Sequence, residues 1–131
     1  MKIRENNYVD KAENVIKELV EESKQKNRGK VNIVTTSKIR NLLAMTADIY
    51  NQVLTHSSER LNEEICSRIE YLRVRFIYEC GREEKVKRFV EKAQLLDVLK
   101  EIGASKSNYI LFSRYMEALI AFHKYYGGKE Q

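Results

Sequence analysis

Apolar positions follow a helical rhythm along most of the chain. In the first such stretch, five apolar residues between Ala12 and Val20 recur at intervals that place them on one face of an α-helix. β-branched residues do not alternate with polar ones at period two, as they would in half-buried strands. The pattern predicts helices over Tyr8–Lys26, Ser37–Leu54, Ser58–Cys80 and Asn108–Tyr126, with two short helices or one bent helix between positions 83 and 102.

These segments predict an all-α fold, a compact bundle of five or six helices in a single domain that covers residues 1–131. Residues 1–30 hold the N-terminal helix and a basic loop, and the other predicted helices follow. The segment Asn108–Tyr126 is the most apolar, so we expect it to be the central helix. Glycines follow several helical patterns and predict left-handed helix ends at Gly29, Gly81, Gly103 and Gly127–Gly128.

Composition changes this picture little. The 131 residues contain no proline. They include 24 Lys and Arg and 19 Asp and Glu, which gives a net charge of +5. A polyanionic partner is therefore possible, but charge alone does not require one. No apolar run approaches the roughly 18 residues that span a bilayer, and no signal peptide opens the chain. We expect a cytoplasmic protein without a membrane partner.

Catalytic and metal-binding patterns are not found. His56 and His123 lack the spacing of metal ligands, and we interpret them as a loop histidine and a histidine on a helix flank. Cys66 and Cys80 fall on one predicted helix, roughly 21 Å apart, which excludes a disulfide between them. The acids Glu83 and Glu84 suit the first turn of a helix. No phosphate-binding loop or dinucleotide fingerprint occurs. We expect no enzyme, no metal and no cofactor.

The stretch "TTSKIRNLL", residues 35–43, reads as a helix start, because hydroxyl side chains precede an apolar rhythm. Its first turn carries Lys38 and Arg40 and no acid. The helix macrodipole opposes such cations by roughly 0.3–1 kcal/mol each. A bound anion would remove the misfit, and so would a tertiary contact with an acidic side chain.

Arginines and tyrosines form a stripe beside the apolar face of the third predicted helix. The stripe consists of Arg68, Tyr71, Arg75, Tyr78 and Arg82. Guanidinium groups match phosphate oxygens, and phenol rings stack on sugars or bases, so the stripe suits nucleic acid. In the alternative interpretation, the tyrosines complete the core while Glu70 and Glu79 neutralise the arginines. The stripe and the "SKIR" turn support each other only if they share a surface.

Three segments resemble the small subunit of the Csm complex, the type III-A CRISPR–Cas effector ribonucleoprotein. They are "TTSKIRNLL", "LNEEICSRIEYLRVRFIYECGREEKVKRFVEKA" and "YMEALIAFHKYYGG", and the resemblance covers about residues 31 to 128. It implies a small non-catalytic bundle, several copies of which stack head to tail in antiviral defence. The copies line the duplex of CRISPR RNA and target RNA. The implied protein partners are a backbone subunit, which cuts the target, and a large polymerase-like subunit.

The resemblance also implies which residues face RNA. The basic residues of its T-S-K-[IL]-R and [YF]-x-x-G-R segments carry this role to Lys38 and Arg40, and to Arg75 and Arg82. The remaining members of the predicted RNA-binding set belong to the same segments, to the stripe or to its vicinity; they are Arg68, Arg73, Ser37 and Tyr78. Such contacts would not read bases, because guide–target pairing already reads the sequence.

Two other functions fit parts of the pattern. In a helix-turn-helix DNA-binding protein, Thr36, Ser37, Lys38 and Asn41 would enter the major groove. That motif needs a tight connection of three or four residues, whereas about ten residues separate Lys26 from the next predicted helix. A purely structural dimerising bundle, by contrast, predicts no salt-dependent binding to nucleic acid.

Overall fold

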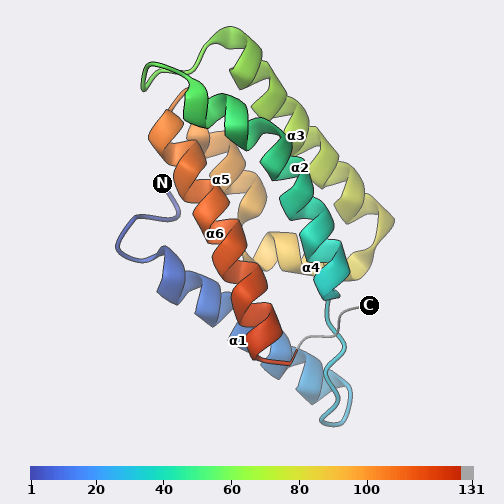
Figure 1. The fold of residues 1–131 in the computed structure, drawn as a ribbon. Coiled ribbons are helices and arrows are strands. Elements are labelled where there is room, and N and C mark those ends of the chain that lie inside the picture. The colour runs from blue at the N-terminus through green and yellow to red at the C-terminus, as the bar shows by residue number, and fades with distance from the viewer. Residues whose placement is uncertain (128–131) are drawn as a thin grey trace.

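Six helices account for most of residues 1–127, the part of the chain that the computed structural model describes (Figure 1). They are α1 (Tyr8–Lys26), α2 (Thr36–Thr55), α3 (Glu63–Arg82), α4 (Glu84–Lys92), α5 (Leu95–Ile102) and α6 (Lys106–Tyr125). Within residues 1–127, the one extended pairing is an isolated bridge between Arg60 and Ser105. The predicted all-α class is confirmed. None of these helices is both long and apolar enough to cross a membrane.

Helix α6 is the central helix, as its apolar sequence predicted. It packs against α1, α2 and α5, and eight of its residues are buried. Two buried phenols tie it to its neighbours: Tyr109 donates a hydrogen bond to the main-chain oxygen of Thr46, and Tyr115 donates one to that of Ala93. These bonds satisfy the polar ends of large side chains inside the apolar core.

Helices α2 and α3 run side by side in opposite directions, so the start of α2 lies beside the end of α3 (Figure 1). A single residue, Glu83, ends α3 and precedes α4. Helices α4 and α5 are separate, because Gln94 between them has a left-handed backbone with φ 58° that breaks the helical path.

The third helix begins at Glu63, five residues after the predicted start at Ser58. Residues 59–61 are drawn toward the chain before α6, because the Lys106 N–H donates to the Glu59 carbonyl and the Leu61 N–H donates to that of Ala104. Asn62 then caps α3 by accepting a hydrogen bond of 2.9 Å from the Ile65 N–H. The extended segment explains why the helical pattern starts late.

Most of the glycine predictions are confirmed. Gly29, Gly103 and Gly127 have φ of 88°, 58° and 85°. Gly81 was wrongly predicted as a left-handed helix end: it lies inside α3, which continues to Arg82 before the extended backbone of Glu83 stops it. Gly128 lies outside the described residues.

Candidate nucleic-acid interface

The start of α2 has the predicted construction. Thr35 is the N-cap residue, and its hydroxyl oxygen accepts a hydrogen bond of 3.4 Å from the Lys38 N–H. Thr36, the first helical residue, is buried, while Ser37 and Lys38 are exposed. The first turn contains no acidic residue. The positive end of the α2 dipole therefore lies beside a cation and has no acidic side chain in its own turn.

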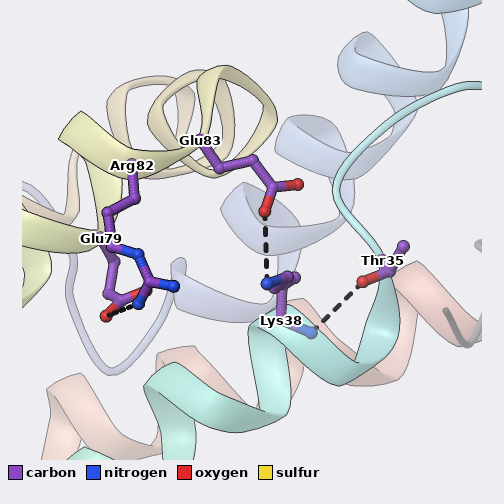
Figure 2. Close-up of polar contacts among 5 residues, drawn as sticks. All are labelled: Thr35, Lys38, Glu79, Arg82 and Glu83. Atoms are coloured by element: carbon purple, nitrogen blue, oxygen red, sulfur yellow. Dashed lines mark hydrogen bonds and ion pairs between the residues drawn. The ribbon is translucent and has the colours of Figure 1, made fainter.

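The acid missing from this turn comes from another part of the chain. The Lys38 ammonium lies 3.4 Å from a carboxylate oxygen of Glu83, as Figure 2 shows. The two side chains remain 46% and 36% exposed, and exposed pairs of this kind contribute only about 0–1 kcal/mol. The tertiary-contact alternative is thus confirmed for Lys38. The contact is weak enough to be exchanged for another anion.

Arg82 lies on the same side of the molecule, at the end of α3 (Figure 2). Its guanidinium is 3.4 Å from a carboxylate oxygen of Glu79 and 5.6 Å from the centre of the Tyr78 ring. Because Glu83 follows Arg82 directly and contacts Lys38, the start of α2 and the end of α3 form one surface. The two sequence signals therefore meet in space.

A groove of about 480 Å³ lies further along α2 and α3, away from the Lys38–Glu83 contact. We call it the α2–α3 groove, and its lining residues are Met45, Asp48, Ile49, Ser67, Arg68, Tyr71, Leu72 and Arg75. Arg68 is 4.0 Å from Glu64. Within residues 1–127, no acid forms an ion pair with Arg75. Arg75 is therefore not held in an ion pair, although the carboxylate of Asp48 lines the same groove.

The tyrosines of the stripe do not complete the core. Tyr71 and Tyr78 are 61% and 60% exposed, and Val74 between them is 56% exposed. The buried face of α3 consists of other residues, namely Ile65, Ile69, Leu72 and Phe76. Two aromatic rings are therefore presented to solvent beside the arginines.

Two predicted residues point elsewhere. Arg40 is two positions beyond Lys38, which places it about 200° around α2, on a different flank. Arg73 is likewise about 200° around α3 from Arg75, and its guanidinium is 2.8 Å from Glu70. Arg68 and Arg75 thus line the α2–α3 groove, and Lys38 and Arg82 lie beyond it, where the start of α2 meets the end of α3. Arg40 and Arg73 face other directions.

His123 has a role that the sequence interpretation missed. It is fully buried, with Nε2 at 2.6 Å from the main-chain oxygen of Val34 and Nδ1 at 3.1 Å from the hydroxyl oxygen of Thr36. Since a carbonyl only accepts, Nε2 carries the proton and Nδ1 accepts from Thr36. The flank interpretation was wrong. Helical spacing held the signal, because His123 follows buried Met116 and Leu119 at intervals of seven and four residues.

Within residues 1–127, no group of three or more His, Cys, Asp or Glu residues could hold a metal ion. Cys66 and Cys80 are free thiols on the continuous helix α3. Burial raises the pKa of the Cys80 thiol, and the nearby Glu91 carboxylate raises it further. A protonated, half-buried thiol is a poor nucleophile.

Comparison with known proteins shows the family of this chain. The family model described as Csm2 Type III-A matches residues 10–129. A CRISPR system Cms protein Csm2 from Streptococcus thermophilus is 44% identical over 128 residues, which are 98% of each chain. A protein of the same name from Mycobacterium tuberculosis H37Rv is 39% identical over the full length of both chains. Another, from Enterococcus italicus, is 38% identical over 86% of this chain and 87% of its own. The chain therefore belongs to the Csm2 family of type III-A CRISPR systems, the small-subunit family that its "TTSKIRNLL" and "YECGR" segments resemble.

Proposed function

We propose that this chain is a non-catalytic small subunit of a type III-A CRISPR RNA-guided effector complex, where it contacts the phosphate backbone of the CRISPR RNA–target RNA duplex. One observation carries the proposal. The Lys38–Glu83 contact joins the cationic start of α2 to the end of α3, so that Lys38 and the arginines of the α2–α3 groove lie on one surface.

A phosphate would satisfy this surface better than the carboxylates that now occupy it. The start of α2 offers N–H groups and the positive end of a helix dipole, which together favour an anion. Lys38 and Arg82 would exchange Glu83 and Glu79 for phosphate oxygens. Arg75 forms no ion pair with a described acid, so a phosphate would compete only with Asp48, which lines the same groove.

The arginines are spaced to follow a strand. Arg68, Arg75 and Arg82 recur every seven residues, so two helical turns separate neighbours and each returns to nearly the same side of α3. They form a line roughly 21 Å long, with Lys38 beside its Arg82 end. The exposed ring of Tyr78 can stack on a ribose or an unpaired base. Backbone contacts of this type bind RNA without reading its sequence.

The remaining candidates have smaller parts in the proposal. Ser37, exposed in the first turn of α2, supplies a hydroxyl donor next to Lys38. Arg40 and Arg73 face other directions, so they would contact RNA that wraps beyond the groove. We expect their replacement to weaken binding less than replacement of Arg75.

Affinity in the complex would come from repetition. A net charge of +5 supports only weak binding by one copy. Copies stacked head to tail as a filament, next to the backbone and large polymerase-like subunits, would present many such surfaces to one duplex. Each bound copy then raises the effective concentration of the next.

The test is binding of purified protein to a guide–target RNA duplex, followed by fluorescence anisotropy over a salt series. The double variant Lys38→Ala/Arg75→Ala should keep its far-UV circular dichroism but bind about tenfold or more weakly, since each lost contact costs roughly 1 kcal/mol. The slope of log K against log salt should fall by about 0.7–0.9 per lost phosphate contact. Arg114→Ala is the control, because Arg114 lies on α6 in a similarly exposed pair with Glu5. Unchanged affinity and slope in the double variant would contradict the proposal.

A second measurement separates the alternatives. The tagged protein, purified gently from its native cell, should bring a discrete CRISPR RNA and larger protein partners with it. A helix-turn-helix protein would instead give a sequence-specific footprint on duplex DNA, although nine residues, 27–35, separate α1 from α2 here. A purely structural dimer would bring neither RNA nor DNA.

A further inference from the structure

We propose that His123 is a positioning residue for RNA binding: by clamping both neighbours of the N-cap residue Thr35, it fixes where α2 begins and where Lys38 points. This inference rests on the proposed function, because it concerns the same surface.

The clamp joins residues that lie far apart in the sequence. His123, near the end of α6, contacts Val34 and Thr36, which are 89 and 87 positions away along the chain. Its two ring nitrogens take one partner each, a carbonyl oxygen before Thr35 and a hydroxyl after it. Val34, Thr36 and His123 are at most 1% exposed, so water cannot substitute for any of these bonds. The N-cap residue is thereby held from both sides.

Val34 and Ile39 anchor the start of α2 in the core, but its other polar restraints are weak. The cap bond from the Lys38 N–H to Thr35 is long, at 3.4 Å, and weak at that length. The Lys38–Glu83 pair is exposed and also weak. In the nine-residue connection before the helix, 27–35, the Asn32 N–H donates to the Ser23 hydroxyl and the Asn32 side chain accepts from Lys85, but both bonds lie three or more residues before Thr35. His123 is thus the buried polar group that decides whether the first turn presents its N–H groups and Lys38 together.

A merely stabilising role makes a different prediction. Tyr109 also joins α6 to α2 through a buried hydrogen bond, of 2.7 Å to Thr46, but it does so ten residues after Thr36. If His123 only adds stability, loss of its bond to Thr36 should affect RNA binding no more than loss of the Tyr109 bond. If His123 positions the helix start, only the first loss should weaken RNA binding.

The experiment compares Thr36→Val, which removes the hydroxyl at nearly constant volume, with Thr36→Ser, which keeps it. Tyr109→Phe serves as the matched control. With the guide–target RNA duplex as probe, Thr36→Val should bind about three- to tenfold more weakly, Thr36→Ser should restore binding, and Tyr109→Phe should bind like the wild type. In a Lys38→Ala background, Thr36→Val should cause little further loss, because both changes act through one contact.

Amide hydrogen exchange gives a direct readout of the helix start. The Ile39 N–H, bonded to the Thr35 carbonyl at 3.2 Å, should exchange faster in Thr36→Val than in Tyr109→Phe. Should Thr36→Val fold poorly, His123→Gln is tested with the same readouts.

The outcomes separate the two proposals. If Lys38→Ala weakens binding while Thr36→Val does not, the positioning role is overturned and the proposed function stands. Equal effects of Thr36→Val and Tyr109→Phe would also overturn it. If Lys38→Ala has no effect, the proposed function fails, and this inference fails with it.

Discussion

The phenol of Tyr109 on α6 donates a hydrogen bond of 2.7 Å to the main-chain oxygen of Thr46, in the middle of α2. Burial raises the pKa of Tyr109, and the charge of Asp48 raises it further, so the phenol remains a neutral donor. Tyr109→Phe should lower the free energy of unfolding by about 1–2 kcal/mol, because the buried carbonyl loses a partner. Urea unfolding should show a lower midpoint with an unchanged m-value. An unchanged midpoint would mean that the bond contributes nothing net.

The Lys38–Glu83 pair competes with any anion that approaches the start of α2. Glu83→Gln removes the carboxylate while keeping the shape of the side chain, and Glu83 makes no side-chain cap bond to α4 that would be lost. The affinity for an RNA duplex should therefore rise about two- to fivefold, since exposed pairs of this kind are worth about 0–1 kcal/mol. The salt dependence should also become steeper. Glu5→Gln, which frees Arg114 on α6, should leave both quantities unchanged if the effect belongs to this surface.

Glu59 links the chain before α3 to the start of α6. Its carboxylate accepts hydrogen bonds from the hydroxyls of Ser107 and Ser105, both at 2.7 Å, and from the Ser107 N–H. These bonds hold the pKa of Glu59 below its ordinary value of 4.5, and the bond from the Ser107 hydroxyl lowers it most. Their contribution to stability is present above pH 4.5 and is lost as the pH falls through the lower folded value. Glu59→Gln should therefore melt at a lower temperature than the wild type at pH 7, and the difference should shrink at low pH. A constant difference across this range would contradict the assignment.

His123 makes the stability of the fold depend on pH in a range closer to neutrality than Glu59 does. Burial lowers its pKa from the ordinary 6.5, as does the charge of Lys124, against the opposing effect of the bond to Val34. As the pH falls, His123 therefore becomes protonated in the unfolded chain at a higher pH than in the folded chain. Stability is fully present above pH 6.5 and falls as the pH drops toward the lower folded value. Urea midpoints measured from pH 7.5 to 5.5 should decline for the wild type and decline less for His123→Gln. Parallel curves would show that another group is responsible.

Sequence periodicity was sufficient for the helices, because an amphipathic helix records its buried face in residue spacing. The central position of α6 followed from the same signal. The pattern failed where distant contacts override local preference. The segment from Ser58 to Asn62 looks helical on its own, but it is not helical, because Glu59 and Leu61 bond to residues more than 40 positions away. The prediction at Gly81 failed for the opposite reason: α3 continues through this glycine and ends at Arg82, before the extended backbone of Glu83.

The candidate site was predictable to the same degree. Thr35 as cap, the acid-free first turn of α2 and the stripe on α3 are local features, and the sequence displays them. The meeting of Lys38 with Glu83, 45 positions along the chain, depends on how α2 packs beside α3. The bonds of His123 to Val34 and Thr36 depend on the packing of α6, which no local pattern encodes.

The central position of α6 has a consequence for synthesis. Helices α1 and α2 both pack on it, yet α6 spans residues 106–125 and is synthesised after the other five described helices. A nascent chain therefore exposes the apolar faces of α1 and α2 until α6 has been made, and it can close its core only afterwards. A truncated product lacks His123 as well as the central helix, so it would have neither a stable core nor an ordered start of α2. Premature termination should accordingly yield fragments for proteolysis rather than defective subunits.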